Sequence, residues 1–294
     1  MNNVNGILLV IVSMAAFSIE DMFIKKLSVG ASTGQIMFAL GLICSLIFLT
    51  MAAVQRKRVF FAEAWGPLPV IRAAAEGIGA LMFITALSLI DLSTVAAVFQ
   101  AMPLMVTMGA ALFLGEQVGW RRWSAIGVGF VGVLMIIRPG MAGFQPETLL
   151  VVATVVAIAA RDLITRRINA NVASSVVAFQ AYFALTLVGI VLMVFSTETA
   201  TPMQMNLAGA LAGAVVFGVL GYYTIVQATR VGEASALTPF RYTRLVFSLM
   251  IGVLILGESP DPMTLAGATL IIGSGLYAFL RERRLARQAA LAAA

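Results

Sequence analysis

The sequence predicts an all-α integral membrane protein in which ten transmembrane helices form two inverted five-helix repeats. Three observations carry this prediction: the composition, the long apolar segments, and a match between the two halves of the chain. Hydrophobic residues make up 61% of the 294 residues and charged residues 11%, whereas soluble domains have roughly 45–50% apolar and about 25% charged residues. This composition excludes a soluble fold.

Ten apolar segments are long enough to span a bilayer, because a spanning helix needs about 20 mostly apolar residues. They are 5–24, 33–54, 68–90, 93–115, 122–138, 147–167, 174–196, 207–229, 233–256 and 263–281. Barrel strands would be about ten residues long and would alternate in polarity, which these segments do not. The first segment is too long for a signal-peptide core and has no basic residue before it, so we expect it to be the first spanning helix.

The basic residues indicate how the chain is oriented. On one side of the predicted membrane lie Arg56, Lys57, Arg58, Arg121, Arg122, Arg166, Arg167, Arg230, Arg281, Arg283, Arg284 and Arg287, and on the other only Lys25, Lys26 and Arg138. Cytoplasmic loops retain Lys and Arg. We therefore expect a multi-pass protein of a bacterial-type inner (plasma) membrane with both termini in the cytoplasm.

The same composition excludes several function classes. The net charge is +6, but the basic residues punctuate apolar segments and do not form the basic surface of a nucleic-acid binder. The chain has no His and one Cys, Cys44, so we expect no disulfide, no metal and no cofactor. Gly127-Val-Gly129-Phe-Val-Gly132 fits the dinucleotide fingerprint, but no strand precedes it. We interpret it, like Gly209–Gly213, as a helix face thinned for close packing.

The second half of the chain repeats the first. At an offset of 142 residues, 86–93 aligns with 228–235 without gaps, and Leu114-Gly-Glu116 aligns with Leu256-Gly-Glu258. At an offset of 141, 21–27 aligns with 162–168, acidic and basic residues included. Because five spans is an odd number, the second half enters from the opposite face, which is the inverted repeat of many transporters.

The acidic residue between the third and fourth helices and the Leu-Gly-Glu that closes the fourth and ninth resemble the EamA branch of the drug/metabolite transporter superfamily. Within it the chain is most similar to YddG-type amino-acid exporters. The resemblance implies a first repeat over 1–141, a second over 142–281 and a cytoplasmic tail over 282–294. The sequence departs from the common pattern at Phe17-Ser18, where a Trp is frequent, and at Pro239-Phe-Arg241-Tyr-Thr-Arg244.

Charged residues inside the spans are the strongest candidates for function, because they must face a cavity or a partner. Arg244 lies about 18 Å from the membrane face, near the midplane of a core about 30 Å thick. Its guanidinium is suited to a substrate carboxylate; alternatively, Arg244 and Arg241 are tied to Glu76 or to backbone carbonyls. Glu76 either pairs with Arg241 as an inner gate or pairs with Arg72 on its own helix, and the spacing allows both.

Two further acidic residues are four positions before a basic one. We expect Asp21 with Lys25, and Asp162 with Arg166, to form salt bridges at helix ends, the basic heads reaching the interface. In the absence of His, Glu76 and Asp162 are the predicted proton carriers.

Uncharged candidates follow from the repeat and from helix breakers. Gln100 and Tyr242 are equivalent at the 142 offset, and we expect both to hydrogen-bond the substrate in a cavity that is also lined by Tyr222, Tyr223, Met102 and Phe83. The predicted hinge residues relax or interrupt helices; they are Pro103, Pro239, Gly77, Gly79, Gly218 and Gly221.

The function expected from these observations is secondary transport: export of amino acids, aromatic ones among them, and of related small metabolites by alternating access. The alternatives are export of other metabolites or drugs, or a passive channel. We expect no enzymatic activity, since the carboxylates are scattered and no phosphate loop or catalytic triad is present. The expected partners are a small-molecule substrate and the lipid bilayer, with the chain acting as a monomer.

Overall fold

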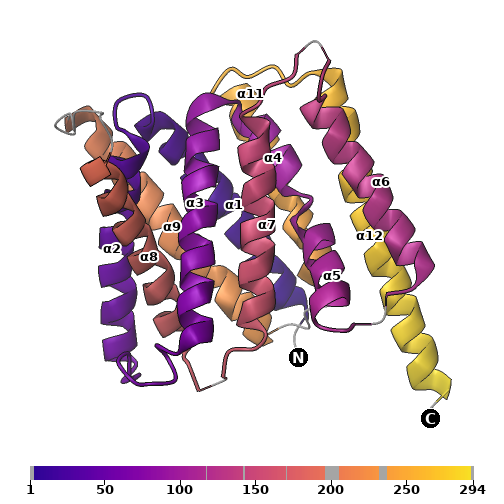
Figure 1. Ribbon diagram of the computed structural model, residues 1–294, viewed down its shortest axis with the longest axis horizontal. Helices are drawn as coiled ribbons and strands as arrows, with labels where there is room; N and C mark the ends of the chain where they lie inside the picture. The colour runs from indigo at the N-terminus through magenta and orange to yellow at the C-terminus, as the bar shows by residue number, and fades with distance from the viewer. Residues whose placement is uncertain are drawn as a thin grey trace.

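The computed structural model describes residues 3–116, 118–141, 143–169, 171–195, 205–231 and 237–292, and every regular element in these ranges is a helix (Figure 1). In order they are α1 (Asn3–Leu27), α2 (Thr33–Val54), α3 (Pro67–Leu89), α4 (Leu92–Phe99), α5 (Met102–Phe113), α6 (Trp120–Ile137), α7 (Thr148–Thr165), α8 (Ser174–Phe195), α9 (Met205–Val231), η1 (Thr238–Tyr242), α11 (Thr243–Leu254) and α12 (Pro262–Ala292).

The predicted fold class is confirmed. Of the described residues, nine helical segments are long and apolar enough to cross a membrane, with α4 and α5 together forming one of them. The remaining predicted span, 233–256, begins outside the described residues, and η1 and α11 form the rest of it. α12 continues beyond the predicted tenth span, through most of the predicted tail 282–294, to Ala292.

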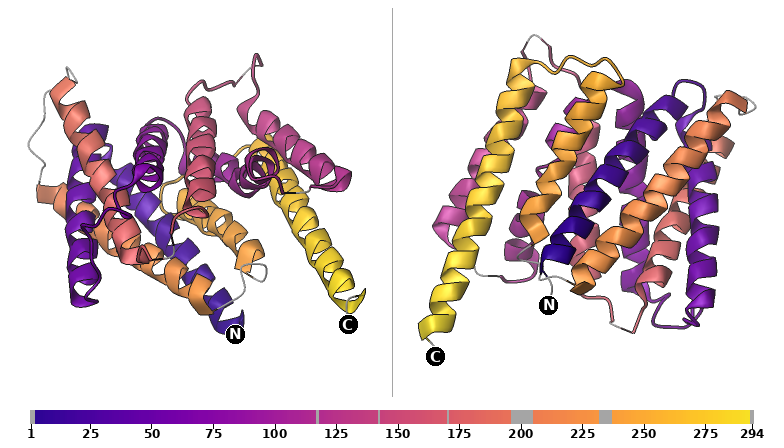
Figure 2. Two further views of the ribbon diagram at one scale, coloured as in Figure 1. Left: turned by 60° about the horizontal axis from the view of Figure 1, so that its bottom comes forward. Right: turned by 180° about the vertical axis from the view of Figure 1, so that it is seen from behind.

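The helix contacts follow the two-fold symmetry of an inverted repeat. The most extensive pairs are α1 with α9, α2 with α8, α6 with α12, and α3 with α7. In the second half, α7, α8, α9 and α12 correspond to α1, α2, α3 and α6 of the first. Exchanging the two halves therefore turns the α1–α9 pair into the α7–α3 pair. The α2–α8 and α6–α12 pairs are each converted into themselves. The start of α1 and the end of α12 lie on the same side of the bundle (Figures 1 and 2).

The fourth helix of each half is irregular beside a proline. α4 ends at Phe99, and α5 starts three residues later at Met102 with Pro103 in its first turn. Pro239 lies in the first turn of η1, and η1 leads directly into α11. A proline has no N–H to donate to the preceding turn, so the first of these helices is divided where the sequence predicts, whereas residues 232–236, which come before η1, lie outside the described part of the chain.

Leu-Gly-Glu ends the fourth helix of each half by the same backbone mechanism. Gly115 and Gly257 have φ values of +69° and +71°, a left-handed conformation that glycine adopts without steric cost. The N–H groups of Glu116 and Glu258 then donate to the carbonyls of Ala110 and Gly252 at 3.2 and 2.8 Å. These bonds terminate the helices and fix the direction in which each glutamate leaves.

Glycines also set the closest helix contacts. An added β-carbon at Gly132 would lie 2.6 Å from the backbone oxygen of Gly267, so α6 and α12 touch through their backbones. Gly129 likewise faces Leu104, whereas Gly127 and Gly209 have no neighbour within 4 Å. The close-packing interpretation of the two glycine motifs is therefore right for part of each and wrong for Gly127 and Gly209.

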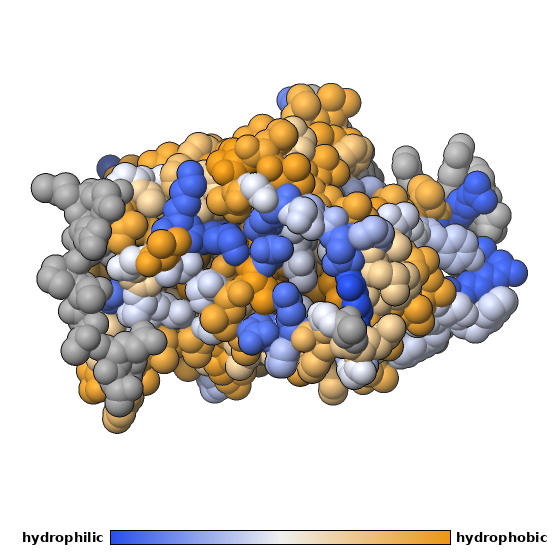
Figure 3. All heavy atoms as spheres, turned by 90° about the horizontal axis from the view of Figure 1, so that it is seen from above, coloured by the Kyte–Doolittle hydropathy of each residue, from blue (hydrophilic) through white to orange (hydrophobic). Residues whose placement is uncertain are grey.

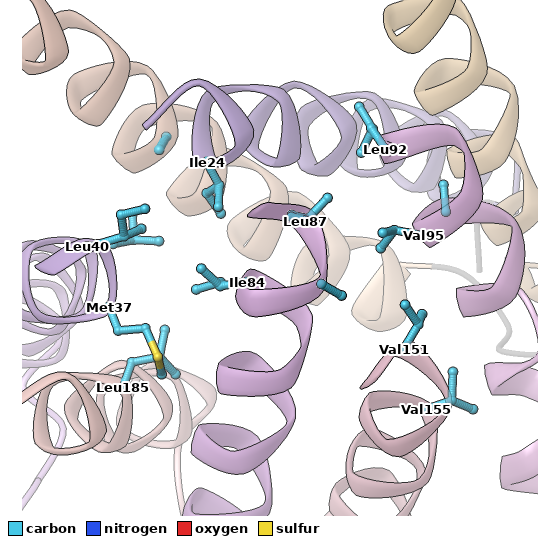
Figure 4. Close-up of a cluster of buried hydrophobic side chains, with 14 of the residues drawn as sticks. Ile24, Met37, Leu40, Ile84, Leu87, Leu92, Val95, Val151, Val155 and Leu185 are labelled. Carbon is cyan, nitrogen blue, oxygen red and sulfur yellow. The ribbon is translucent and has the colours of Figure 1, made fainter. Parts of the chain in front are cut away.

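An apolar layer occupies the half of the bundle away from the termini. It includes the far ends of α1 and α3, the start of α4 and the start of α7, with Ile24, Ile84, Leu92 and Val151 at 5% exposure or less (Figure 4). Large apolar side chains such as Phe195, which is 81% exposed, instead point away from the bundle. Figure 3 shows hydrophilic residues across the middle of the face opposite the termini, between apolar margins. The molecule therefore presents an apolar perimeter suited to lipid.

An ion pair fastens the loops on that face. Arg138, at the end of α6, pairs with Asp261, which precedes α12. Burial alone would raise the pKa of Asp261, but hydrogen bonds from Thr264 and the charge of Arg138 outweigh it and lower this pKa.

Candidate functional site: a charged cavity between the repeats

A cavity of about 410 Å³ lies between the two repeats and is lined by residues from both. This volume is in the range of small-molecule sites, roughly 300–1,000 Å³. Its upper wall includes Ile24, Leu40, Ile84 and Leu185, all of which are buried in the apolar layer (Figure 4). Its lower end reaches Thr165, an exposed residue at the end of α7 on the side of the termini. The cavity is thus closed on one side by the apolar layer and extends toward the other.

Most of the predicted site residues line this cavity. They are Arg244, Gln100, Tyr222, Phe83, Met102, Glu76, Arg241, Pro103 and Gly79. Gln100 is 4% exposed, and its side-chain nitrogen has no hydrogen-bond partner in the part of the chain that the structure describes.

Tyr242 lies elsewhere, which corrects the prediction that it shares the site with Gln100. Its hydroxyl occupies the space beside Gly275, where a β-carbon would collide with it. Arg241 near the end of η1 and Arg244 in the first turn of α11 both line the cavity, whereas Tyr242 between them points toward α12. Tyr223 is 44% exposed and does not line the cavity either.

The glycines predicted as hinges are contact positions in this structure. A β-carbon would collide with the Glu20 carboxylate at Gly218 and would lie 2.8 Å from the Phe17 ring at Gly221. Gly77 packs on Val188, and Gly79 on Ile158. Of these glycines, only Gly79 lines the cavity. Pro239 lies in the first turn of η1 and does not line it.

Arg244 is already neutralised. Its guanidinium donates to the Asp21 carboxylate at 2.7 Å and lies 4.9–5.6 Å from the ring centres of Phe17, Phe83 and Phe99. Such cation–π contacts are worth about 0.5–2 kcal/mol each. The predicted alternative tied Arg244 to Glu76 or to backbone carbonyls, whereas the structure ties it to Asp21.

The expected Asp21–Lys25 salt bridge is wrong. Lys25 instead donates to the carbonyls of Leu87 and Ile90 at 3.2 and 2.5 Å. The last carbonyls of a helix have no intrahelical partner, so the ammonium at the end of α3 satisfies them. Asp21, which is 3% exposed, needs an interhelical cation because water cannot solvate it there.

A second charged cluster lies nearer the termini. Glu76 accepts a hydrogen bond from Arg161 at 2.7 Å and forms an ion pair with Arg72 at 3.0 Å, and Arg161 also pairs with Asp162 at 2.7 Å. Of the two predicted partners of Glu76, the structure therefore shows Arg72, on the same helix. The predicted gate between Glu76 and Arg241 is not formed among the described residues. Arg161 was not predicted as a partner, because sequence spacing does not reveal that α7 packs beside α3.

The predicted Asp162–Arg166 bridge is also wrong, since Arg166 pairs with Glu116 at 2.9 Å. Glu258, which corresponds to Glu116 in the second repeat, has a different role. Its two carboxylate oxygens accept hydrogen bonds from the backbone N–H groups of Leu92 and Ser93 at 2.7 and 2.9 Å. An anion at a helix N-terminus is stabilised by the helix dipole. Glu258 therefore caps α4 of the other repeat and holds the closed side of the cavity together.

Two charged side chains of the cavity remain without such contacts. No hydrogen bond or ion pair within the described ranges reaches the Arg241 guanidinium or the Glu20 carboxylate, and both residues line the cavity. Sequence reasoning overlooked Glu20, although an acidic residue deep in an apolar helix is a signal of function in itself.

A bundle of apolar helices in two inverted repeats, enclosing a charged cavity that is closed on one side, has the architecture of a membrane transporter. The EamA-like transporter family matches residues 4–138 and again residues 145–280. The chain belongs to this family.

Several curated relatives match nearly the whole chain. The S-adenosylmethionine uptake transporter of Rickettsia prowazekii (strain Madrid E) is 27% identical, over 95% of this chain and 94% of that protein. The riboflavin transporter of Rhizobium johnstonii is 26% identical over 97% and 94%, and the pseudopaline exporter of Pseudomonas aeruginosa (strain UCBPP-PA14) is 25% identical over 91% and 93%. These relatives do not support the finer resemblance to YddG-type amino-acid exporters.

A solved crystal structure shares the fold. It superposes with a TM-score of 0.63 at 20% identity, covering 95% of this chain and 98% of the other. This likeness concerns the fold alone.

Proposed function

We propose that this protein is a secondary carrier that exports an amphoteric metabolite built on an amino acid across a bacterial inner membrane, with both termini in the cytoplasm. The observation that carries the proposal is the Arg241 guanidinium, which lies in a cavity shared by both repeats without a partner in the described chain. A planar guanidinium binds a carboxylate through two parallel hydrogen bonds. The sequence favoured Arg244 for this task, but Asp21 already occupies Arg244.

The walls around Arg241 suit an amino acid with a large apolar or aromatic group. Phe83, Phe99, Met102, Tyr182 and Tyr222 all line the cavity, and the rings of Phe83 and Phe99, like those of Tyr182 and Tyr222, pack edge-on against each other. S-adenosylmethionine, which names one group of relatives, is itself an amino acid that bears a purine. This group of relatives supports the proposed class, and the counterflow experiment identifies the particular substrate.

Transport by alternating access requires that the closed side opens while the other closes. The Glu258 cap on α4 supplies a releasable contact on the closed side, and the break before α5 and the 3-10 turn η1 before α11 let half-helices move. In the proposed opposite state, the side that is closed here is open and the side of the termini is closed, so that the two repeats exchange conformations. The apolar layer above the cavity (Figure 4) favours a carrier over the alternative of a passive channel.

Counterflow in proteoliposomes tests the function. Vesicles that contain the purified protein are loaded with unlabelled S-adenosylmethionine, phenylalanine or tryptophan, and uptake of the labelled compound is followed. A carrier gives a transient accumulation that saturates with concentration, whereas a channel gives neither. Arg241→Gln should lower the affinity for the carboxylate at least tenfold, while Arg58→Gln, an exposed loop residue, is the matched control. Absence of counterflow with every compound would refute the proposal for this substrate class.

A further inference from the structure

We infer that Glu20 is the cation-binding residue of the cavity, so that the transported molecule carries a positive charge, an ammonium or sulfonium, held against Glu20 while its carboxylate lies on Arg241. The inference rests on the proposed function and specifies its substrate class as a zwitterion, or a zwitterion with one further positive charge.

The charges of the cavity lining balance. Four acidic and four basic residues line it: Glu20, Asp21, Glu76, Asp162, Arg72, Arg161, Arg241 and Arg244. Ion pairs of 2.7–3.0 Å join six of them in two groups, one made of Asp21 with Arg244 and the other of Glu76, Arg72, Arg161 and Asp162. One anion, Glu20, and one cation, Arg241, are left over.

A buried charge without a partner is costly, because the interior cannot replace its hydration. Glu20 is 8% exposed and has no ion pair among the described residues. The neighbouring Asp21, in contrast, is paired with Arg244. A substrate that carries both a positive and a negative charge gives each of the two remaining groups a partner. A dianion or an uncharged molecule does not.

The surroundings of Glu20 are suited to a cation. Its carboxylate lies against Gly218 of α9, where a β-carbon would collide with it. Tyr222 follows one turn later on the same face of α9, and its ring packs edge-on against Tyr182 at 6.5 Å. Both tyrosines line the cavity. A carboxylate beside aromatic rings combines charge attraction with cation–π attraction, the usual recognition of ammonium groups.

The two unpaired groups are at different heights. Arg241 precedes Arg244 by three residues across the junction of η1 and α11, roughly 4.5–6 Å at about 1.5–2 Å per residue, toward the termini. Glu20 adjoins Asp21, which contacts Arg244. The substrate is therefore expected to span the cavity lengthwise, with its carboxylate toward the termini and its cation deeper.

Matched probes test this assignment. Binding of S-adenosylmethionine, phenylalanine, phenethylamine and 3-phenylpropanoate is measured calorimetrically on the full-length protein in detergent. Glu20→Gln should weaken the two zwitterions and phenethylamine at least tenfold and leave 3-phenylpropanoate unchanged. Arg241→Gln should weaken the two zwitterions and 3-phenylpropanoate and leave phenethylamine unchanged. This crossed pattern cannot come from misfolding, which lowers binding of every probe, and Glu20→Asp should recover part of the lost affinity.

Glu63→Gln, at an exposed loop position, is the control. If the wild-type protein binds the zwitterions and Glu20→Gln behaves as Glu63→Gln does, the role of Glu20 is overturned while the carrier function stands. If the wild-type protein binds neither zwitterion and shows no counterflow with them, the proposed function fails, and the inference fails with it.

Discussion

Replacing Glu258 by Gln should open the closed side of the cavity. The carboxylate accepts two backbone N–H bonds from the start of α4, at 2.7 and 2.9 Å. Asp91, the residue that precedes α4, makes no capping bond of its own, so the cap comes entirely from the other repeat. Glutamine keeps one acceptor oxygen but directs an NH₂ group at the second N–H.

The size of the effect follows from these bonds. A hydrogen bond to a charged group is worth about 1.5–3 kcal/mol, and the loss of the charge at a helix N-terminus costs about 0.3–1 kcal/mol more. Because Glu258 is only half-buried, we take roughly 1–2 kcal/mol as the net loss. At 1.4 kcal/mol per factor of ten, the open population should rise about 5- to 30-fold.

Thiol labelling measures this population. Cys44, the single cysteine, is replaced by Ala, and a cysteine is introduced at Ile84, which lines the cavity and is 3% exposed. A membrane-impermeant thiol reagent is added on the side of the α3–α4 loop. Glu258→Gln should accelerate labelling 5- to 30-fold relative to Glu63→Gln. An unchanged rate would show that the cap does not hold the closed state.

Three further predictions concern stability. Asp21→Asn leaves Arg244 without its anion, which should cost about 3 kcal/mol and lower the melting temperature of the detergent-solubilised protein; a melting temperature equal to that of wild type would contradict the buried pair. Asp261 has a lowered pKa, so it stabilises the fold above the ordinary value of 3.8 and this contribution is lost as the pH falls through the lowered pKa. Asp261→Asn should therefore be less stable than wild type at about pH 5–8, with the difference in melting temperature vanishing in more acidic buffer. Gly132→Val should cost about 1–3 kcal/mol by forcing α6 and α12 apart, and Gly127→Val, which meets open space, should cost little; equal effects would refute the assigned contact.

The sequence determined the architecture because each of its signals is local. A span is predicted by its own apolar length, the helix interruptions by Pro103 and Pro239, and the two turns by the glycines of Leu-Gly-Glu. The internal repeat adds the relation between the halves. Each needs only neighbouring residues or an alignment of the chain with itself, and the lipid solvent leaves helices as the main way to satisfy the backbone.

Only the tertiary structure decided which charges meet. Four-residue spacing favoured Asp21 with Lys25 and Asp162 with Arg166, yet in the bundle Asp21 binds Arg244, 223 residues away, and Lys25 caps α3. A buried charge takes the partner that is nearest in space, since no water competes for it. Which partner is nearest depends on how the helices pack. The same packing leaves Glu20 and Arg241 facing the cavity and turns Tyr242 away from it, which no pattern within one helix could have shown.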